Sequence, residues 1–429
     1  MSAAPGKRLS GLEEAFVRLD RWYPTGRLQI GGIARLTGQA PSLDEFREHV
    51  LPRLVSFPAL GVRIGSTRPW MWEGVSEQDA AGQFFTRACP PGSGPSGLRT
   101  VVEAVLAVPL RRDRPLWEVW LLHGYVSDEW TALLKTHHAV LDGASITLVL
   151  NRIFDAIPAV QEPPVRPPAP QTKKTDLLTV VRGTGRFLAG FFPLAGRPFS
   201  RCGKNKKGKR QFRWASVDRE RLRRVAELHG VTVNDVFLAA VTGAIRQWPH
   251  TPWRRGRISP VWTLMPVDLH RREGDHRPGL KAAAVRTLLP CDEPDPLRRL
   301  AAIAGATPQV KGSSRVPVTS AGLRSLPIWF QRLMFALTFS SRYVSMITSN
   351  MRGPESALYH CGVPATRLAP LGPLPNKHRL GAYLYNDAEL ATIGFVLDDE
   401  LPDGEELCLL WVEAVTELEQ AGRTASRSR

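Results

Sequence analysis

The stretch from Thr131 to Val149 constrains the fold more than any other part of the chain. It begins with an apolar run beside Trp130, continues through Thr136-His137-His138, and becomes apolar again after Asp142-Gly143. Apolar runs bounded by a turn pair such as Asp-Gly are typical of buried elements. The stretch therefore predicts a buried strand ending at the histidines, a tight turn, and the start of a helix.

The two histidines at the end of this strand should point to opposite faces, because successive strand residues alternate in direction. That geometry argues against a metal chelate formed by His137 and His138 together. It favours one imidazole acting as a general base while the other packs or orients its surroundings. With an unperturbed pKa of about 6.5, an imidazole can accept a proton from an attacking hydroxyl or thiol near neutral pH.

The spacing His-His-x-x-x-Asp-Gly resembles the HHxxxDG signature of acyltransferases with the chloramphenicol-acetyltransferase-like fold, which include condensation domains and plant acyltransferases. The resemblance implies that His138 is the general base and that His137 lies beside the substrate. It also implies that Asp142 turns away from the substrate and holds the loop, and that Gly143 leaves room at the reaction centre.

Three further motifs occur in order along the chain: Pro115-Leu116-Trp117-Glu118, Asn234-Asp235-Val236, and Ser349-Asn350-Met351-Arg352-Gly353-Pro354. Together with HHxxxDG they are similar to the bacterial wax ester synthase/diacylglycerol acyltransferase family. The resemblance implies substrate-binding positions at Trp117, Asn234 and Asn350. Trp117 is equally compatible with core packing. Asn234 is either a helix N-cap, for which Asn is well suited, or an amide donor to the acceptor hydroxyl or the oxyanion.

Some positions depart from the family pattern. Arg352 stands where the family usually has Pro, and Leu280 follows Gly279 where a Gly-Asn pair is usual. The segment from Lys377 to Gly381 replaces a Gly-Gln-Gly-Leu sequence that shapes the acceptor side in relatives. The acceptor is therefore open to other chemistry than a plain fatty alcohol or diacylglycerol.

Charge and composition narrow the class of partner. The formal net charge is +17, and residues 177–217 carry ten Lys and Arg but no acidic residue. Such a balance favours a polyanionic partner. No nucleic-acid-binding motif is present, so we expect no nucleic acid. Residues 177–213 are either a solvated interdomain linker or a peripheral contact with an anionic membrane or lipid body.

The five cysteines have no CxxC spacing, so neither a disulfide framework nor a zinc site is indicated. Their odd number fits a reducing compartment. There is no signal-peptide pattern and no apolar run of about 18 residues. We expect a cytoplasmic enzyme, either free or peripheral to a membrane or to lipid inclusions. The resemblance implies acyl-CoA as a substrate, so no cofactor is expected.

The remaining pattern predicts alternating elements. Helices are expected over residues 12–20, 43–54 (with Ser42 and Glu45 as a capping box), 219–228 (closed by Gly230), 235–246, 295–304 and 323–339, and from the HHxxxDG turn to about 157. Strands are expected over residues 28–36, 101–109, 117–122, 212–217 and 257–266. Gly31-Gly32 in the first strand match a Gly pair of the family, or mark a bulge.

The implied architecture is α/β, with two chloramphenicol-acetyltransferase-like lobes of mixed sheets and helices and an active-site channel between them. The sequence divides into an N-terminal lobe over 1–158, a Pro-rich and then basic linker over 159–211, and a C-terminal lobe over 212–429. The implied activity is acyl transfer from acyl-CoA to a fatty alcohol or diacylglycerol. The alternatives are transfer from a carrier-protein thioester to a polar acceptor, and a non-catalytic lipid-body protein.

Overall fold

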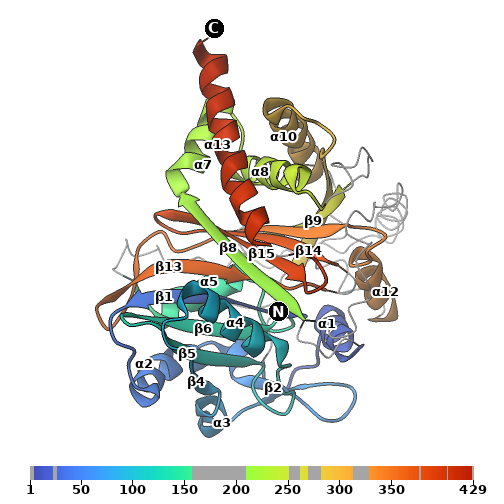
Figure 1. Ribbon diagram of the computed structural model, residues 1–429. Coiled ribbons are helices and arrows are strands. Elements are labelled where there is room, and N and C mark those ends of the chain that lie inside the picture. Colours follow the sequence, from blue (N-terminus) through green and yellow to red (C-terminus); the bar gives the residue numbers. More distant parts are fainter. Residues whose placement is uncertain are drawn as a thin grey trace, which may run out of the picture.

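The computed structural model describes residues 4–22, 27–156, 209–250, 261–268, 282–312, 328–375, 378–402 and 404–427. These residues form two lobes, each built on a mixed β-sheet (Figure 1). The observed architecture agrees with the α/β prediction. Most of the basic segment 177–213 lies outside the described residues, so its expected membrane contact stays a prediction.

The first sheet has seven strands and carries the HHxxxDG segment on a central strand, β6. In spatial order its strands are β4 (Phe84–Ala88), β5 (Trp117–Val126), β6 (Glu129–His137), β1 (Gln29–Thr37), β13 (Val363–Leu371), β12 (Leu358–His360) and β7 (Asp155–Ala156). A two-stranded ribbon and a short 3-10 helix complete the strand framework of this lobe: β2 (Val62–Ile64), β3 (Trp72–Gly74) and η1 (Pro58–Leu60).

The second sheet has six strands, which in spatial order are β10 (Ala282–Leu289), β9 (Val261–Asp268), β11 (Met346–Arg352), β14 (Leu380–Asn386), β15 (Leu390–Asp398) and β8 (Arg210–Asp218). Helices gather on its outer side in Figure 1, namely α7 (Arg219–His229), α8 (Val233–Gln247), α10 (Pro296–Gly312) and α13 (Glu405–Arg427). The helices of the first lobe are α1 (Gly11–Trp22), α2 (Leu43–Val55), α3 (Glu77–Ala81), α4 (Gly94–Ala107) and α5 (Gly143–Ile153).

One segment of the second half of the chain belongs to the first sheet. Strand β13 pairs with β1, and β12 pairs with β13 and with β7. Helix α12 (Ile328–Thr338) also packs against α1 of the first lobe. The boundary at residue 212 that the sequence suggests is therefore a division along the chain, and residues 358–371 cross it in space.

Local capping interactions explain where several helices begin and end. Ser42 and Glu45 form the expected capping box of α2, and Gly230 ends α7 with a left-handed backbone. Thr232 and Asp235 form a second capping box at the start of α8. Asn234 therefore lies inside the first turn of α8 and is not its N-cap.

The expected strand over residues 101–109 is wrong, because this segment lies in helix α4. Its buried residues Leu98, Val101, Val102, Val105 and Leu106 recur at helical spacing. The β-branched valines favour a strand locally, but burial of one helical face outweighs that preference. Residues 94–97 form the first turn of the same helix.

Gly31 is required by a close approach between strands and not by a bulge. The pairing of β1 with β6 is continuous through this position. A Cβ atom on Gly31 would lie 1.8 Å from the carbonyl oxygen of Leu134. Any side chain here would force β1 away from the strand that carries the histidines.

A shared core joins the lobes. Leu133 of β6 and Ile33 of β1 face α4, Phe212 of β8 and Tyr383 of β14, whereas Ala132 and Leu134 face the core under α1, α2 and α5. Two buried polar contacts also cross between the lobes. Arg27 donates to the Asp398 carboxylate at 2.7 Å, and Arg210 donates to the carbonyl oxygen of Leu106 at 3.1 Å.

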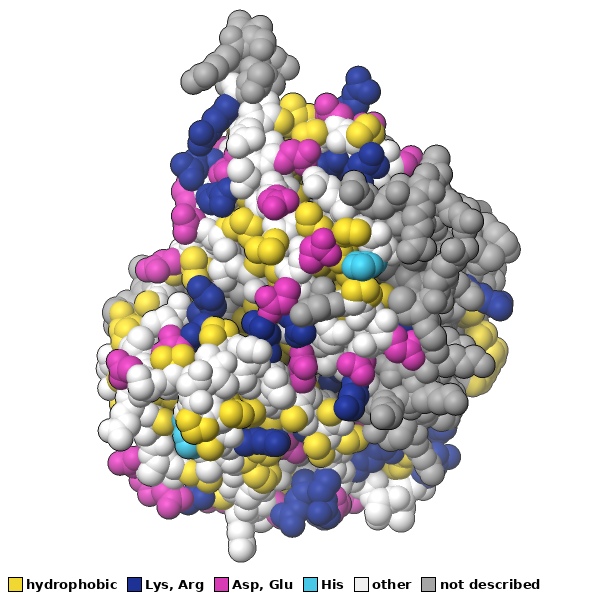
Figure 2. Space-filling view, in the orientation of Figure 1, with side chains coloured by type: hydrophobic (Ala, Val, Ile, Leu, Met, Phe, Trp, Pro, Cys, Tyr) yellow, Lys and Arg dark blue, Asp and Glu magenta, His cyan; other side chains and the backbone are white. Residues whose placement is uncertain are grey.

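The surface of the described residues shows no single basic patch on the face drawn in Figure 2, where cationic and anionic side chains are interspersed. None of the helices in the described ranges is by itself long and apolar enough to cross a membrane. One bent pair, α7 with α8 at 104°, meets that test of length and composition.

Candidate active site

The HHxxxDG residues form the predicted strand, turn and helix start. Strand β6 ends at His137, and the backbone N–H of Val140 donates to the His137 carbonyl oxygen at 2.9 Å. The turn residues Ala139 and Leu141 are fully buried. Helix α5 begins at Gly143. The turn is thus a rigid, buried support for the two imidazoles.

His137 and His138 have different surroundings, as the alternation of strand residues predicts. The Nδ1 atom of His137 accepts a hydrogen bond from the Ala139 N–H at 3.0 Å, and its Nε2 lies 3.7 Å from a carboxylate oxygen of Asp20. His138 donates its backbone N–H to the Leu28 carbonyl at 3.1 Å. His137 is therefore held on both ring nitrogens, and it orients the turn.

The His138 ring packs at the edge of an aromatic cluster. It stacks on Phe16 of α1 with ring centroids 4.7 Å apart and an interplanar angle of 23°. Phe16 in turn contacts Phe335 at 4.6 Å and Phe339 at 6.0 Å. The aromatic wall thus combines α1 with α12, a helix from the second half of the chain.

Burial lowers the pKa of His138 below its usual 6.5, while its own backbone and the nearby Asp142 carboxylate act in the opposite direction. A lowered pKa keeps the imidazole neutral at pH 7. The neutral imidazole is the form that accepts a proton, so the environment maintains His138 as a base.

Asp142 and Gly143 shape the turn. The Asp142 side chain accepts a hydrogen bond from the Ser145 N–H at 2.9 Å and caps α5. A Cβ atom on Gly143 would lie 2.7 Å from the Met351 sulfur. The absence of a side chain at Gly143 therefore lets the HHxxxDG helix approach the Ser-Asn-Met-Arg-Gly-Pro motif.

The two motifs are tied together by hydrogen bonds. The Thr147 hydroxyl of α5 donates to the Arg352 carbonyl at 2.7 Å. Beside it, the Asn350 side-chain oxygen accepts from the Asn386 amide at 2.7 Å. Asn350 is half-buried and its amide links β11 to β14. Its assignment as a substrate-binding residue stays a prediction.

Asn234 and Trp117 have contrasting environments. The Asn234 amide nitrogen lies 3.2 Å from the Met265 sulfur, a weak acceptor, and the residue is half-buried. Trp117 is fully buried, and its indole N–H donates to the Leu60 carbonyl at 2.7 Å. The substrate-wall interpretation of Trp117 is therefore replaced by core packing.

A buried ion pair explains the glutamate of the Pro-Leu-Trp-Glu motif. Lys135 is completely buried in β6, opposite Glu118 in β5, and its ammonium lies 2.9 Å from the Glu118 carboxylate. The same ammonium donates to the carbonyl oxygens of Val105 and Val108 at 3.1 and 2.8 Å. A cation at this helix end is favoured by the helix dipole. In the sequence, a lysine two residues before His137 in an otherwise apolar strand is the signal that could have predicted this ion pair.

The segment from Lys377 to Gly381, which departs from the family pattern, lies mostly within the described residues. His378 is buried, with Nδ1 2.7 Å from the Pro375 carbonyl oxygen, and Arg379 donates to Glu400 at 3.1 Å. Lys377 lies outside the described residues. The basic side chains at positions 378 and 379 are thus engaged with the protein.

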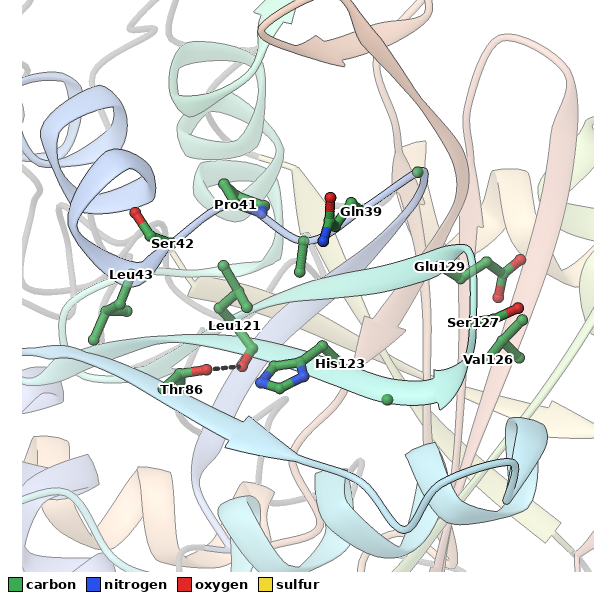
Figure 3. Close-up of a pocket in the computed structure, with 13 residues that line it drawn as sticks. Gln39, Pro41, Ser42, Leu43, Thr86, Leu121, His123, Val126, Ser127 and Glu129 are labelled. Carbon is green, nitrogen blue, oxygen red and sulfur yellow. Dashed lines mark hydrogen bonds between the residues drawn. The ribbon is translucent and has the colours of Figure 1, made fainter.

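A surface cleft of about 460 Å³ lies at the opposite end of β6 (Figure 3). His123 and Glu129 line it, and Thr86 donates to the Leu121 carbonyl at its floor. Glu129 begins β6 and His137 ends it, so at about 3.3 Å per residue they are roughly 26 Å apart. The cleft is therefore separate from the histidines.

Comparison with known proteins agrees with this site and fold. Residues 9–196 match the model of the wax ester synthase/diacylglycerol acyltransferase catalytic domain, and residues 279–419 match the C-terminal domain of the same family. The chain belongs to this family and is an acyltransferase.

Curated relatives from mycobacteria cover most of the chain. A probable diacylglycerol O-acyltransferase of Mycobacterium tuberculosis is 24% identical over 96% of this chain and 95% of its own. A second, putative diacylglycerol O-acyltransferase of M. tuberculosis is 29% identical over 74% of this chain and 70% of its own.

Solved structures share the fold. The wax ester synthase/diacylglycerol acyltransferase from Marinobacter aquaeolei VT8 has a TM-score of 0.67 at 21% identity, covering 97% of this chain and 100% of that one. The first condensation domain of the calcium-dependent antibiotic synthetase has a TM-score of 0.65 at 16% identity, covering 98% and 96%. The predicted chloramphenicol-acetyltransferase-like fold is thereby confirmed.

Proposed function

We propose that the protein transfers an acyl group from acyl-CoA to the hydroxyl of a fatty alcohol or diacylglycerol, with His138 as the general base. The single observation that carries this proposal is the stacking of His138 on Phe16 at the buried turn between β6 and α5, where burial lowers the pKa of the imidazole. The names of the mycobacterial relatives support diacylglycerol as one acceptor.

The proposed reaction is a direct transfer. His138 takes the proton of the acceptor hydroxyl, and the oxygen attacks the thioester carbonyl to form the new C–O bond. The tetrahedral oxyanion collapses, the C–S bond breaks, and the imidazolium returns its proton to the CoA thiolate. Asn234 is proposed as an amide donor to the oxyanion or the acceptor hydroxyl. The products are an ester and CoA, and the base is regenerated.

The aromatic wall supports an apolar substrate. Phe335 is buried beside Phe16, while Trp329 on the same helix is 65% exposed. Helix α12 thus presents aromatic side chains from the surface inward to the neighbour of His138. An acyl chain lying along this helix would be shielded from water by the same rings that keep the imidazole neutral.

A panel of acyl-CoA donors against fatty alcohol, diacylglycerol and polar acceptors tests the assignment, with thiol release and product mass as readouts. We expect saturable CoA release that requires an apolar alcohol and yields an ester of matching mass. Turnover only with a carrier-protein thioester and a polar acceptor would instead establish the alternative acyltransferase function. No turnover with any pair would favour the non-catalytic lipid-body protein.

We also propose that residues 177–213 attach a cytoplasmic enzyme reversibly to anionic membranes or lipid inclusions. Each basic residue near such a surface contributes about 1 kcal/mol. Neutralising Lys204, Lys206, Lys207 and Lys209 should weaken vesicle binding by about 4 kcal/mol at most, and salt should weaken the wild type in the same way.

Vesicle flotation measures this binding. The matched control neutralises four surface cations elsewhere, namely Arg47, Arg111, Arg223 and Arg342, and should float like the wild type at each salt concentration. Equal flotation of all three proteins would show that the basic segment does not bind the membrane and serves only as an interdomain linker.

A further inference from the structure

Two histidines and a cysteine from distant parts of the chain meet at the edge of the first sheet. His49 lies in α2, His360 ends β12, and Cys361 follows it in the turn to β13. One ring nitrogen of each histidine and the Cys361 sulfur all lie within 4.8 Å of one another. It is the one group of this kind found among the described residues.

The distances within the group suit a tetrahedral ion. The Cys361 sulfur is 3.6 Å from Nδ1 of His49. With Zn–N of about 2.0–2.1 Å and Zn–S of about 2.3 Å, tetrahedral N and S ligands lie roughly 3.5 Å apart. This pair therefore already has the spacing of two ligands of one zinc ion, and the third donor needs a shift of roughly 1 Å.

The third donor is a buried histidine with an unpaired ring nitrogen. His360 is only 4% exposed and is surrounded by the rings of Phe46, Trp130 and Phe154. Its Nδ1 atom is buried and has no hydrogen-bond partner among the described residues. Burying such a polar atom unpaired is unfavourable, so a ligand that satisfies it would stabilise the fold.

Asp155 provides the outer contact that metal-binding histidines usually have. Its Oδ2 lies 3.5 Å from Nε2 of His49, whereas the other ring nitrogen, Nδ1, is the one beside the Cys361 sulfur. The carboxylate is itself fixed by Arg53 at 2.9 Å and by the Cys361 N–H at 3.3 Å. A carboxylate behind the second ring nitrogen orients a histidine and selects its tautomer for metal binding.

The backbone at Cys361 gives independent support. Cys361 is the one non-glycine residue of the described chain with positive φ, at 48°, and Gly362 follows at 81°. Such a tight turn between strands favours Asn or Gly at both positions. A cysteine held there against this preference indicates that its side chain has a purpose.

We propose that His49, His360 and Cys361 bind one zinc ion, with Asp155 as the outer partner of His49. Binding releases the Cys361 thiol proton to solvent and leaves a fourth position for water. The ion would fasten the turn between β12 and β13 to α2, and so hold the strands contributed by the second half of the chain in the first sheet.

The test uses the full-length protein, freed of metal by dialysis against a chelator and then titrated with Zn²⁺. We expect one zinc per chain, and with Co²⁺ we expect the visible absorption of a tetrahedral site with a thiolate ligand. Zinc should also protect Cys361 from alkylation by iodoacetamide.

Cys361→Gly distinguishes the role of Cys361 as a metal ligand from its role in the turn. Gly suits the positive φ, so the metal-free variant should fold at least as well as the wild type. It should lose stoichiometric zinc, whereas the control His123→Ala, in the cleft of Figure 3, should keep it. Asp155→Asn should weaken zinc affinity about 10–100-fold. Zinc far below one per chain, equal zinc in Cys361→Gly, or alkylation that zinc does not slow would each overturn the proposal.

Discussion

Replacing Asp142 by Ala and by Asn separates its structural role from its effect on His138. The Asp142 side chain caps α5 through the buried Ser145 N–H at 2.9 Å. Loss of an N-cap costs about 0.5–2 kcal/mol, and because this cap lies in a buried turn, Asp142→Ala should lower the free energy of unfolding by about 2 kcal/mol. Asn caps helices as well as Asp does, so Asp142→Asn should retain most of it.

Both substitutions should change the pH dependence in the same direction. The Asp142 carboxylate raises the pKa of His138 against the larger lowering by burial. Removing the charge should lower that pKa further, so the acid limb of kcat/KM should move to lower pH in both variants. Urea denaturation and a pH profile of thioester cleavage measure the two effects separately.

Two outcomes would contradict this role of Asp142. If Asp142→Asn lost as much stability as Asp142→Ala, the cap would not be the stabilising contact, and a buried ion pair worth about 3–5 kcal/mol would be. If Asp142→Ala lost activity with unchanged stability, Asp142 would belong to the chemistry.

Two further substitutions test the strands that carry the site. Gly31→Ala should prevent accumulation of folded protein, because its Cβ would lie 1.8 Å from the Leu134 carbonyl oxygen. The control Gly305→Ala, in a helix with open space around it, should stabilise the protein by up to about 1 kcal/mol. Soluble yield and melting temperature measure both effects. Glu118→Gln should cost about 3–5 kcal/mol, because it leaves the Lys135 ammonium buried without its counter-ion. A melting temperature equal to that of the wild type would show that the carbonyl contacts of Lys135 suffice.

The elements near the site could be predicted where local chemistry determines them. The apolar run, the histidine pair and Asp142-Gly143 predict the strand, turn and helix that the structure contains. The Ser42 capping box and Gly230 likewise follow from side-chain chemistry within a few residues. These signals are short-range, so no knowledge of the rest of the chain is needed to interpret them.

Features that depend on distant contacts could not be predicted. The sequence predicts a strand where helix α4 lies, because its valines locally favour β-structure. Burial of one helical face outweighs that preference. Phe16 stacks on His138, and β12 and β13 pair into the first sheet; both contacts join segments far apart in sequence. The cluster of His49, His360 and Cys361 depends on the same pairing of β12 and β13 with the first sheet. No short sequence motif therefore predicts it.

The central claim is that His138 is the base, and the pH profile of kcat/KM for acyl transfer, measured with wild type, His138→Ala and His137→Ala, tests it most directly. Because burial lowers the pKa of His138, wild-type activity should hold at pH 6.5 and fall only as the pH drops through the lowered pKa, where the imidazole becomes protonated. Stability should begin to decrease at higher pH than activity, from about pH 6.5 down to the lowered pKa, because the unfolded chain takes up the proton first.

His138→Ala should lose at least about 10²–10⁴-fold in turnover and lose the acid limb while remaining folded. His137→Ala should lose less and keep the limb, because its ring orients the turn through Ala139. A folded His138→Ala enzyme that retained its rate and its acid limb, or a folded His137→Ala enzyme that lost more, would contradict the assignment.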